Sequence, residues 1–232
     1  MKALLTFVFS CSVIWQLLVP LCLKGYNPIW ISLIAVCFLC AVIIFAIAGF
    51  GMKGWTAFLG SFLGVLSSCA MAKLFTALLH VNGNVMSRSQ ALFFAGYEYL
   101  NMTDLFIGSL FLASSGAVMD LAMDVSAGMR ELVYHKPGIG RRELLASGLR
   151  IGKSVVGTMS TTLLLAYAGG YLTLMMSFQA EGVMMEDILN YPYVVPEIVK
   201  TLVGSIGLVL VAPLTALVGC WLMKYAKGPV LD

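Results

Sequence analysis

Long apolar runs separated by polar connectors dominate the chain. Six runs are long enough to cross the roughly 30 Å hydrocarbon core of a bilayer as helices. Short connectors with Pro28 or glycine separate the first three runs, and longer polar segments follow the others. The pattern predicts an all-α, polytopic membrane helix bundle in which residues 1–232 form a single transmembrane domain. The predicted spans are 4–23, 29–50, 55–79, 105–126, 151–178 and 199–223.

Composition agrees with this pattern. Hydrophobic residues make up 60% of the 232 residues and charged residues only 11%, whereas a soluble domain carries about 25% charged residues. We therefore expect the lipid bilayer as the main partner, with no nucleic acid, and we exclude secreted enzymes. Cys37 and Cys40 form a CxxC pair without a further ligand nearby, so neither a metal nor a cofactor is expected.

The placement of basic residues predicts the orientation. With the N-terminus inside, ten Lys and Arg side chains fall on the inner side and three on the outer side. Because inner loops carry the excess of Lys and Arg, both termini are expected inside the cell. The inner set is Lys2, Lys53, Arg130, Lys136, Arg141, Arg142, Arg150, Lys153, Lys224 and Lys227, and the outer set is Lys24, Arg88 and Lys200.

The connector at 127–150 lies on the inner side and carries much of this charge. Leu144, Leu145 and Leu149 recur near helical spacing opposite basic residues. This pattern predicts a short helix lying on the inner membrane surface. An ordinary positive-inside loop is the alternative interpretation.

Glycines inside the apolar runs predict close helix contacts, because a small residue lets two backbones approach. Gly60 and Gly64 form a GxxxG pattern in the third span. We expect a packing role for five glycines in all: Gly60, Gly64, Gly116, Gly152 and Gly157.

Two carboxylates interrupt the fourth span. Asp120 and Asp124 are four residues apart, so they share one helix face. A charged side chain at a helix centre in the membrane costs roughly 2.5 kcal/mol or more, so this face must meet protein, water or a cation. The pair is the main candidate for a functional site. A structural polar network is the alternative for both, and exposure at the inner interface is a second alternative for Asp124.

Depth predicts partners for the two aspartates on the fifth span. At 1.5 Å per residue, Asp120 lies about 22 Å from the outer boundary, level with Thr158, and Lys153 lies level with Asp124. We therefore expect Thr158 to hydrogen-bond Asp120 and Lys153 to pair with Asp124. The predicted site for proton or cation coupling is Asp120, Asp124, Lys153, Thr158, Thr161 and Thr162.

Several short motifs after residue 115 resemble one known family. They are Gly116-Ala-Val-Met-Asp120, Glu131-Leu132, Ser147-Gly148, Ile151-Gly152-Lys153, Gly157-Thr-Met-Ser-Thr-Thr-Leu163 and Ala166-Tyr167-Ala-Gly169. They are similar to the YibE/F family of bacterial multi-pass membrane proteins, and to its short YibF-like members rather than the longer YibE-like ones. The resemblance implies a location in the bacterial inner membrane and a possible YibE-like membrane partner. It implies no particular activity.

A weaker likeness links the chain to the transmembrane half of RND transporters and of the SecD/SecF proteins. These proteins share the G-x-x-x-D run in a fourth span, a following Glu and a fifth span with Thr-Thr. In them, embedded acids relay protons to a large outer domain. The likeness implies that this chain could be a proton-coupling partner of a longer subunit.

Three hypotheses for function follow. The first is a membrane transport or coupling subunit that uses Asp120. The second is a non-transporting scaffold or assembly subunit for a longer partner or within a homo-oligomer. An intramembrane aspartyl protease is third and disfavoured, because its two acids must face one another across helices, so we expect no enzyme activity.

Overall fold

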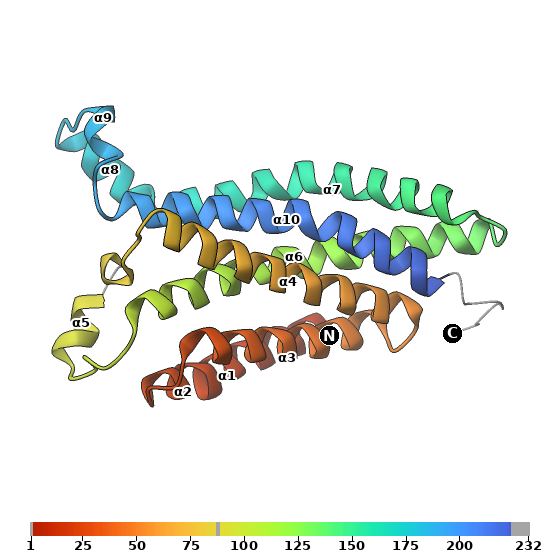
Figure 1. Ribbon diagram of the computed structural model, residues 1–232, viewed down its shortest axis with the longest axis horizontal. Helices are drawn as coiled ribbons and strands as arrows, with labels where there is room; N and C mark the ends of the chain where they lie inside the picture. Colours follow the sequence, from red (N-terminus) through yellow and green to blue (C-terminus); the bar gives the residue numbers. More distant parts are fainter. Residues whose placement is uncertain (1, 87–88, 224–232) are drawn as a thin grey trace.

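The computed structural model describes residues 2–86 and 89–223 of the chain. In that part every regular element is a helix. The long helices run side by side as an elongated bundle (Figure 1). Five of them, and one bent pair, are long and apolar enough to cross a membrane. The fold is therefore the expected polytopic helical bundle, with up to six crossings.

The elements follow one another along the chain with few residues between them. They are α1 (Lys2–Val13), η1 (Ile14–Leu18), α2 (Val19–Leu23), α3 (Pro28–Ala48), α4 (Met52–Leu78), η2 (Gly83–Val85), α5 (Ser89–Phe94), α6 (Met102–His135), α7 (Arg141–Gly170), α8 (Leu172–Ala180), α9 (Met185–Ile188) and α10 (Val194–Leu222). The first crossing is made by α1, η1 and α2 together.

Local sequence explains several helix boundaries. The Asn27 side chain accepts a hydrogen bond from the Ile29 amide at 3.0 Å, and Pro28 occupies the first turn of α3. Asn101 caps α6 in the same way. The π turn η1 lies just before Pro20. Because proline lacks an N–H and clashes with the carbonyl four residues earlier, the wider turn accommodates it.

The centre of the bundle is formed by α4, α6 and α10, which all contact one another. Small residues set the spacing between α4 and α10. A Cβ on Gly64 would meet Val211 at 2.6 Å, and Gly60 lies directly against Thr215. The Ser126 hydroxyl donates to the Lys53 carbonyl at 2.7 Å, which ties α6 to the first turn of α4. As a result α6 has more buried side chains than any other described helix.

The other helices surround this centre. α7 packs on α10 and α6, and α3 packs on α6 and α4. α1 lies outermost and packs on α3 (Figure 1). Gly152 of α7 approaches α10, where a Cβ would meet Ala212 at 2.8 Å.

The prediction of an interfacial helix within 127–150 is wrong. α6 continues to His135 and α7 begins at Arg141, so the connector is a short turn between two long antiparallel helices. Leu144 is only 2% exposed and packs in one cluster with Met129, Ala216 and Cys220. The apolar spacing in this segment therefore reflects helix packing and not contact with the membrane surface.

The predicted fifth span, 151–178, is not one straight helix. α7 ends at Gly170, and α8 leaves it at an angle of 57°. The other five spans lie within α1–η1–α2, α3, α4, α6 and α10, apart from a few terminal residues. The fourth span belongs to a helix of 34 residues, which is about 51 Å long.

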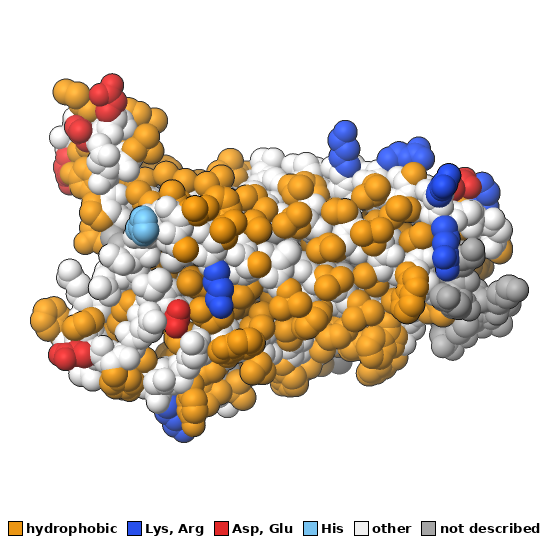
Figure 2. All heavy atoms as spheres, viewed as in Figure 1, with side chains coloured by type: hydrophobic (Ala, Val, Ile, Leu, Met, Phe, Trp, Pro, Cys, Tyr) orange, Lys and Arg blue, Asp and Glu red, His pale blue; other side chains and the backbone are white. Residues whose placement is uncertain are grey.

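The charged side chains divide between the two ends of the bundle. Figure 2 shows Lys and Arg gathered at the end that holds the α6–α7 turn. We call this the inner end, because the positive-inside rule predicts that it faces the cytoplasm. Among the predicted cations, Arg88, Lys224 and Lys227 lie outside the described residues, as does the side chain of Lys2.

The five glycines expected at helix contacts fall into two groups. A Cβ on Gly60, Gly64 or Gly152 would collide with a neighbouring helix. A Cβ on Gly116 or Gly157 would meet nothing within 4 Å. The predicted packing role of Gly116 and Gly157 is therefore wrong for contacts within this chain, because both lie on exposed faces of their helices.

This difference gives a test of the bundle. We expect Gly64→Leu to lower the free energy of unfolding by about 1–3 kcal/mol, because the added side chain overpacks the α4–α10 contact. The matched change Gly157→Leu on an open face should stay within about 0.5 kcal/mol of wild type. Unfolding of purified protein in mixed detergent micelles measures both, and equal losses would contradict the assignment.

Candidate functional site

One stripe of α6 is left uncovered by the other residues that the structure describes. Ala113, Gly116, Asp120, Asp124 and Glu131 are exposed, whereas the residues beside them on α6 are mostly buried. Their spacings of three, four and seven residues place them on one face. The most buried helix of the bundle thus presents two carboxylates to the outside at membrane depth.

α7 borders this stripe on one side. Ile151 packs on α6 at Gly128, where a Cβ would meet its Cδ1 at 2.9 Å. Thr158 and Thr162 follow Ile151 by seven and eleven residues, which are close to two and three full helical turns. They therefore lie on the same flank of α7 as Ile151. By these spacings the α6 stripe and this flank of α7 lie on either side of the α6–α7 contact, and we call this surface the lateral groove.

Thr158 lies at nearly the same depth as Asp120, as the rise per residue predicts. Counted from the shared contact of Gly128 and Ile151, Asp120 lies about 12 Å outward along α6 and Thr158 about 10 Å outward along α7. Sequence reasoning therefore placed Thr158 and Asp120 at nearly the same level of the bundle.

The predicted direct contacts are nevertheless absent among the described residues. Thr158 donates its hydroxyl to the Val155 carbonyl at 2.9 Å and not to Asp120. Lys153 makes no ion pair within 4.0 Å with Asp124, because it lies about 160° around α7 from Ile151. Both expected pairings are wrong.

The other two predicted threonines behave differently from each other. Thr161 donates to the Gly157 carbonyl at 3.3 Å and is turned about 80° away from the Ile151 flank. Thr162 donates to the Thr158 carbonyl at 3.1 Å and lies on that flank. The structure thus brings Thr158 and Thr162 to the groove and leaves Lys153 and Thr161 outside it.

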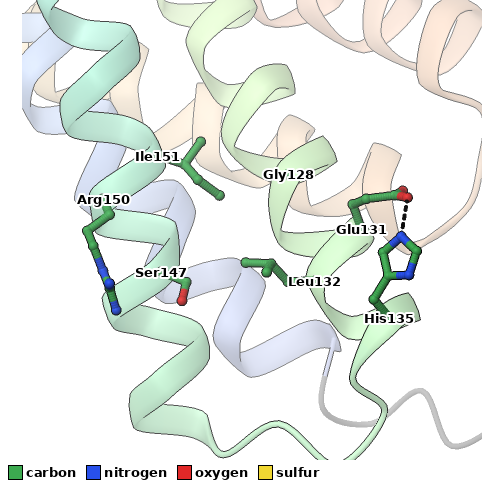
Figure 3. Close-up of a pocket in the computed structure, with 7 residues that line it drawn as sticks. All are labelled: Gly128, Glu131, Leu132, His135, Ser147, Arg150 and Ile151. Carbon is green, nitrogen blue, oxygen red and sulfur yellow. Dashed lines mark hydrogen bonds and ion pairs between the residues drawn. The ribbon is translucent and has the colours of Figure 1, made fainter.

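A pocket lies between the inner ends of α6 and α7. Its volume is about 470 Å³. Figure 3 shows Leu132, Ser147 and Ile151 between the two helices, with Arg150 pointing away from α6. The lining residues are Gly128, Glu131, Leu132, His135, Ser147, Arg150 and Ile151.

The pocket continues the acidic stripe toward the inner water. Glu131 accepts from His135 at 3.1 Å (Figure 3), and both side chains are about 70% exposed. From Glu131 the stripe runs outward through Asp124 to Asp120.

This arrangement suits a small positive ion or a proton. Neither Asp120 nor Asp124 accepts a hydrogen bond or forms an ion pair within the described part of the chain. Both keep their carboxylate oxygens free for another donor. Among the described residues, no group of three or more His, Cys, Asp or Glu could hold a metal ion.

Comparison with known proteins agrees with the motifs in the second half of the chain. A family model described as YibE/F-like protein matches residues 1–225. The chain belongs to the YibE/F family. No curated protein and no solved structure matches it.

The family match extends beyond the motifs read from the sequence. Those motifs begin at Gly116, whereas the model of the YibE/F family also covers the apolar first hundred residues. Together with five apolar helices of membrane-spanning length, it identifies an integral, multi-pass membrane protein.

The YibE/F chain also holds a polar cluster that sequence reasoning missed. Lys200 of α10 pairs with Glu197 at 3.0 Å and donates to the Tyr171 hydroxyl at 3.4 Å. Sequence reasoning placed Lys200 only among the outer cations. The available signal was the spacing of three residues between Glu197 and Lys200, together with Tyr171, which follows two glycines.

The separation of Lys153 from Asp124 can be measured. In a double-mutant cycle with Asp124→Asn and Lys153→Met, we expect a coupling energy below about 0.5 kcal/mol, because the two side chains share no contact. Unfolding of the four proteins in mixed micelles gives this energy. A coupling of about 1 kcal/mol or more would show that the ion pair exists.

Proposed function

We propose that this YibE/F protein is a transport or energy-coupling subunit of the bacterial inner membrane that binds a proton or a cation at Asp120. One observation carries the proposal. Asp120 lies on the central membrane helix, is exposed on its surface and has no partner among the described residues. A side chain of this kind inside a membrane is by default a functional-site hypothesis.

The physical argument concerns the cost of the free carboxylate. An unpaired charge in hydrocarbon is unfavourable, and a proton or a bound cation removes most of that cost. The free energy of the bundle is therefore lower when Asp120 holds a proton or a cation than when it is ionised and empty. Binding at Asp120 can in this way be coupled to a conformational change that covers or exposes the α6 stripe. Asp124 lies about 6 Å closer to the inner end and would pass the ion inward or outward.

The groove supplies a route from the inner water to this site. The exposed pair of Glu131 and His135 stands at the pocket. Thr158 and Thr162 border the outer part of the groove. Lys153 and Thr161 keep no direct role in this proposal, because they lie on other faces of α7.

A scaffold or assembly subunit for a longer YibE-like partner, or within a homo-oligomer, is the second candidate. Gly116 favours it, because nothing lies within 4 Å of its open side and it is one turn from Asp120. A helix of another chain could approach α6 closely there. An enzyme is not proposed, since both aspartates share one face of one helix.

A flux assay tests the first candidate. We expect purified protein in vesicles to move protons under an imposed membrane potential, and Asp120→Asn to reduce this flux to that of protein-free vesicles. The amide keeps the size of the side chain but cannot take up a proton. An internal pH-sensitive dye measures the flux at several values of external pH.

Two controls separate the candidates. Glu143→Gln changes an exposed acid that pairs with Lys136 outside the groove, and it should leave the flux unchanged. Gly116→Leu should break partner assembly if the protein is a scaffold. Full flux with Asp120→Asn would contradict the coupling role, and if Gly116→Leu then abolished function, the scaffold would be supported instead.

A further inference from the structure

The outer end of the molecule carries an arm that the coupling proposal does not use. The arm consists of α8 and α9 with their connecting turn, residues 172–188, and it projects from the end of α7 (Figure 1). α8 is bent by 57° from α7.

The length of α7 places the arm at the edge of the membrane. From Lys153, near the predicted inner boundary, to Gly170 there are 17 residues, or about 26 Å of helix. This distance nearly crosses a hydrocarbon core of roughly 30 Å. α7 and α8 qualify as a crossing only as a bent pair. By length α7 covers most of that crossing, so α8 begins close to the outer boundary.

The polar cluster around Lys200 fixes the joint. Tyr171 is the residue between α7 and α8, and Lys200 both donates to its hydroxyl and lies 5.9 Å from the centre of its ring. Glu197 pairs with Lys200 at 3.0 Å. Gly169 and Gly170 have open space around them, so the bend is held by Tyr171 and not by packing at the glycines.

The arm has a covered side and an uncovered apolar side. Phe178 is 6% exposed and packs on Tyr191, with ring centres 4.8 Å apart and the rings tilted by 56°. Leu172, Met175 and Met176 share an exposed face of α8 by their spacing of three and four residues. Met185 at the start of α9 is 80% exposed.

This apolar surface continues the lipid-facing side of α7. Leu164 and Leu165 are exposed on the last turns of α7, and Leu172 follows them directly across the bend. The acidic residues of the arm stand at its far end, beside the hydrophobic side chains (Figure 2). The arm thus offers apolar side chains to hydrocarbon and carries its acidic residues beyond α8, where they can reach water.

We propose that the α8–α9 arm lies in the outer membrane interface and inserts Leu172, Met175, Met176 and Met185 among the acyl chains of the outer leaflet. Its partner is the lipid surface, and the Tyr171–Lys200–Glu197 cluster sets its angle. The proposal is independent of the role of Asp120, because it concerns a different end of the bundle and needs no ion.

Photolabelling in vesicles tests the proposal. A diazirine-bearing amino acid is introduced at Met176 or at Met185, and the purified protein is reconstituted in phosphatidylcholine vesicles. On irradiation the diazirine loses nitrogen, and the carbene inserts into the nearest C–H or O–H bond. We expect mass spectrometry to find mainly phospholipid adducts at both positions.

Two control positions calibrate the products. At Glu186, on the acidic end of the arm, insertion into water should dominate. At Phe178, which is buried, the label should cross-link within the chain. Mainly water insertion at both Met176 and Met185 would overturn the proposal. Cross-links from these positions to a second copy of the chain would also overturn it, and would make the arm an interface between protein chains.

Discussion

Close contact among α4, α6 and α10 is the constraint on which the rest of the structure depends. Gly60 against Thr215 and Gly64 against Val211 bring α4 and α10 together without room for a further side chain. Inside a membrane no hydrophobic effect draws helices together, so packing of small residues has to supply the attraction. This contact seats α6 in the centre and fixes its rotation, and the rotation decides that Asp120 and Asp124 face outward.

The two ends of the bundle differ in charge, and the acidic stripe of α6 lies between them. Cations gather at the inner end, where the pocket between α6 and α7 is lined by Glu131 and His135. The outer end carries the acidic and methionine-bearing arm, held by Lys200. Asp120 lies between these ends on a face that the other described residues do not cover. The bundle thus presents an exposed ionisable stripe on α6.

Sequence reasoning reached the fold class and the family, because hydropathy and short motifs carry that information locally. It also placed Thr158 level with Asp120, since level depends only on the rise per residue. It failed for Lys153 and Asp124, because an ion pair depends on the rotation of each helix. That rotation is set by distant contacts such as Ile151 on Gly128. Helix rotation also explains why the sequence does not distinguish Gly64 from Gly116. Gly64 faces Val211 of α10, whereas Gly116 faces open space.

Two other errors have a physical cause of the same kind. The spacing of Leu144, Leu145 and Leu149 is amphipathic whether the partner is a membrane surface or another helix, and only tertiary packing distinguishes the two. Hydropathy likewise continues through Leu172 to Phe178, so it does not reveal the bend after Gly170. At the bend Tyr171 contacts Lys200, which lies 29 residues further along the chain.

The most direct measurement for the central claim is chemical modification of Asp120 by a hydrophobic carbodiimide, which partitions into the membrane and reacts with protonated carboxyl groups. The account predicts that mass spectrometry of vesicle-embedded protein finds Asp120 modified, with less modification as the pH rises. Asp104, which accepts from Asn27 at 3.3 Å outside the groove, should stay unmodified. An unmodified Asp120 at every pH would contradict the claim that it is an accessible proton-binding carboxyl group.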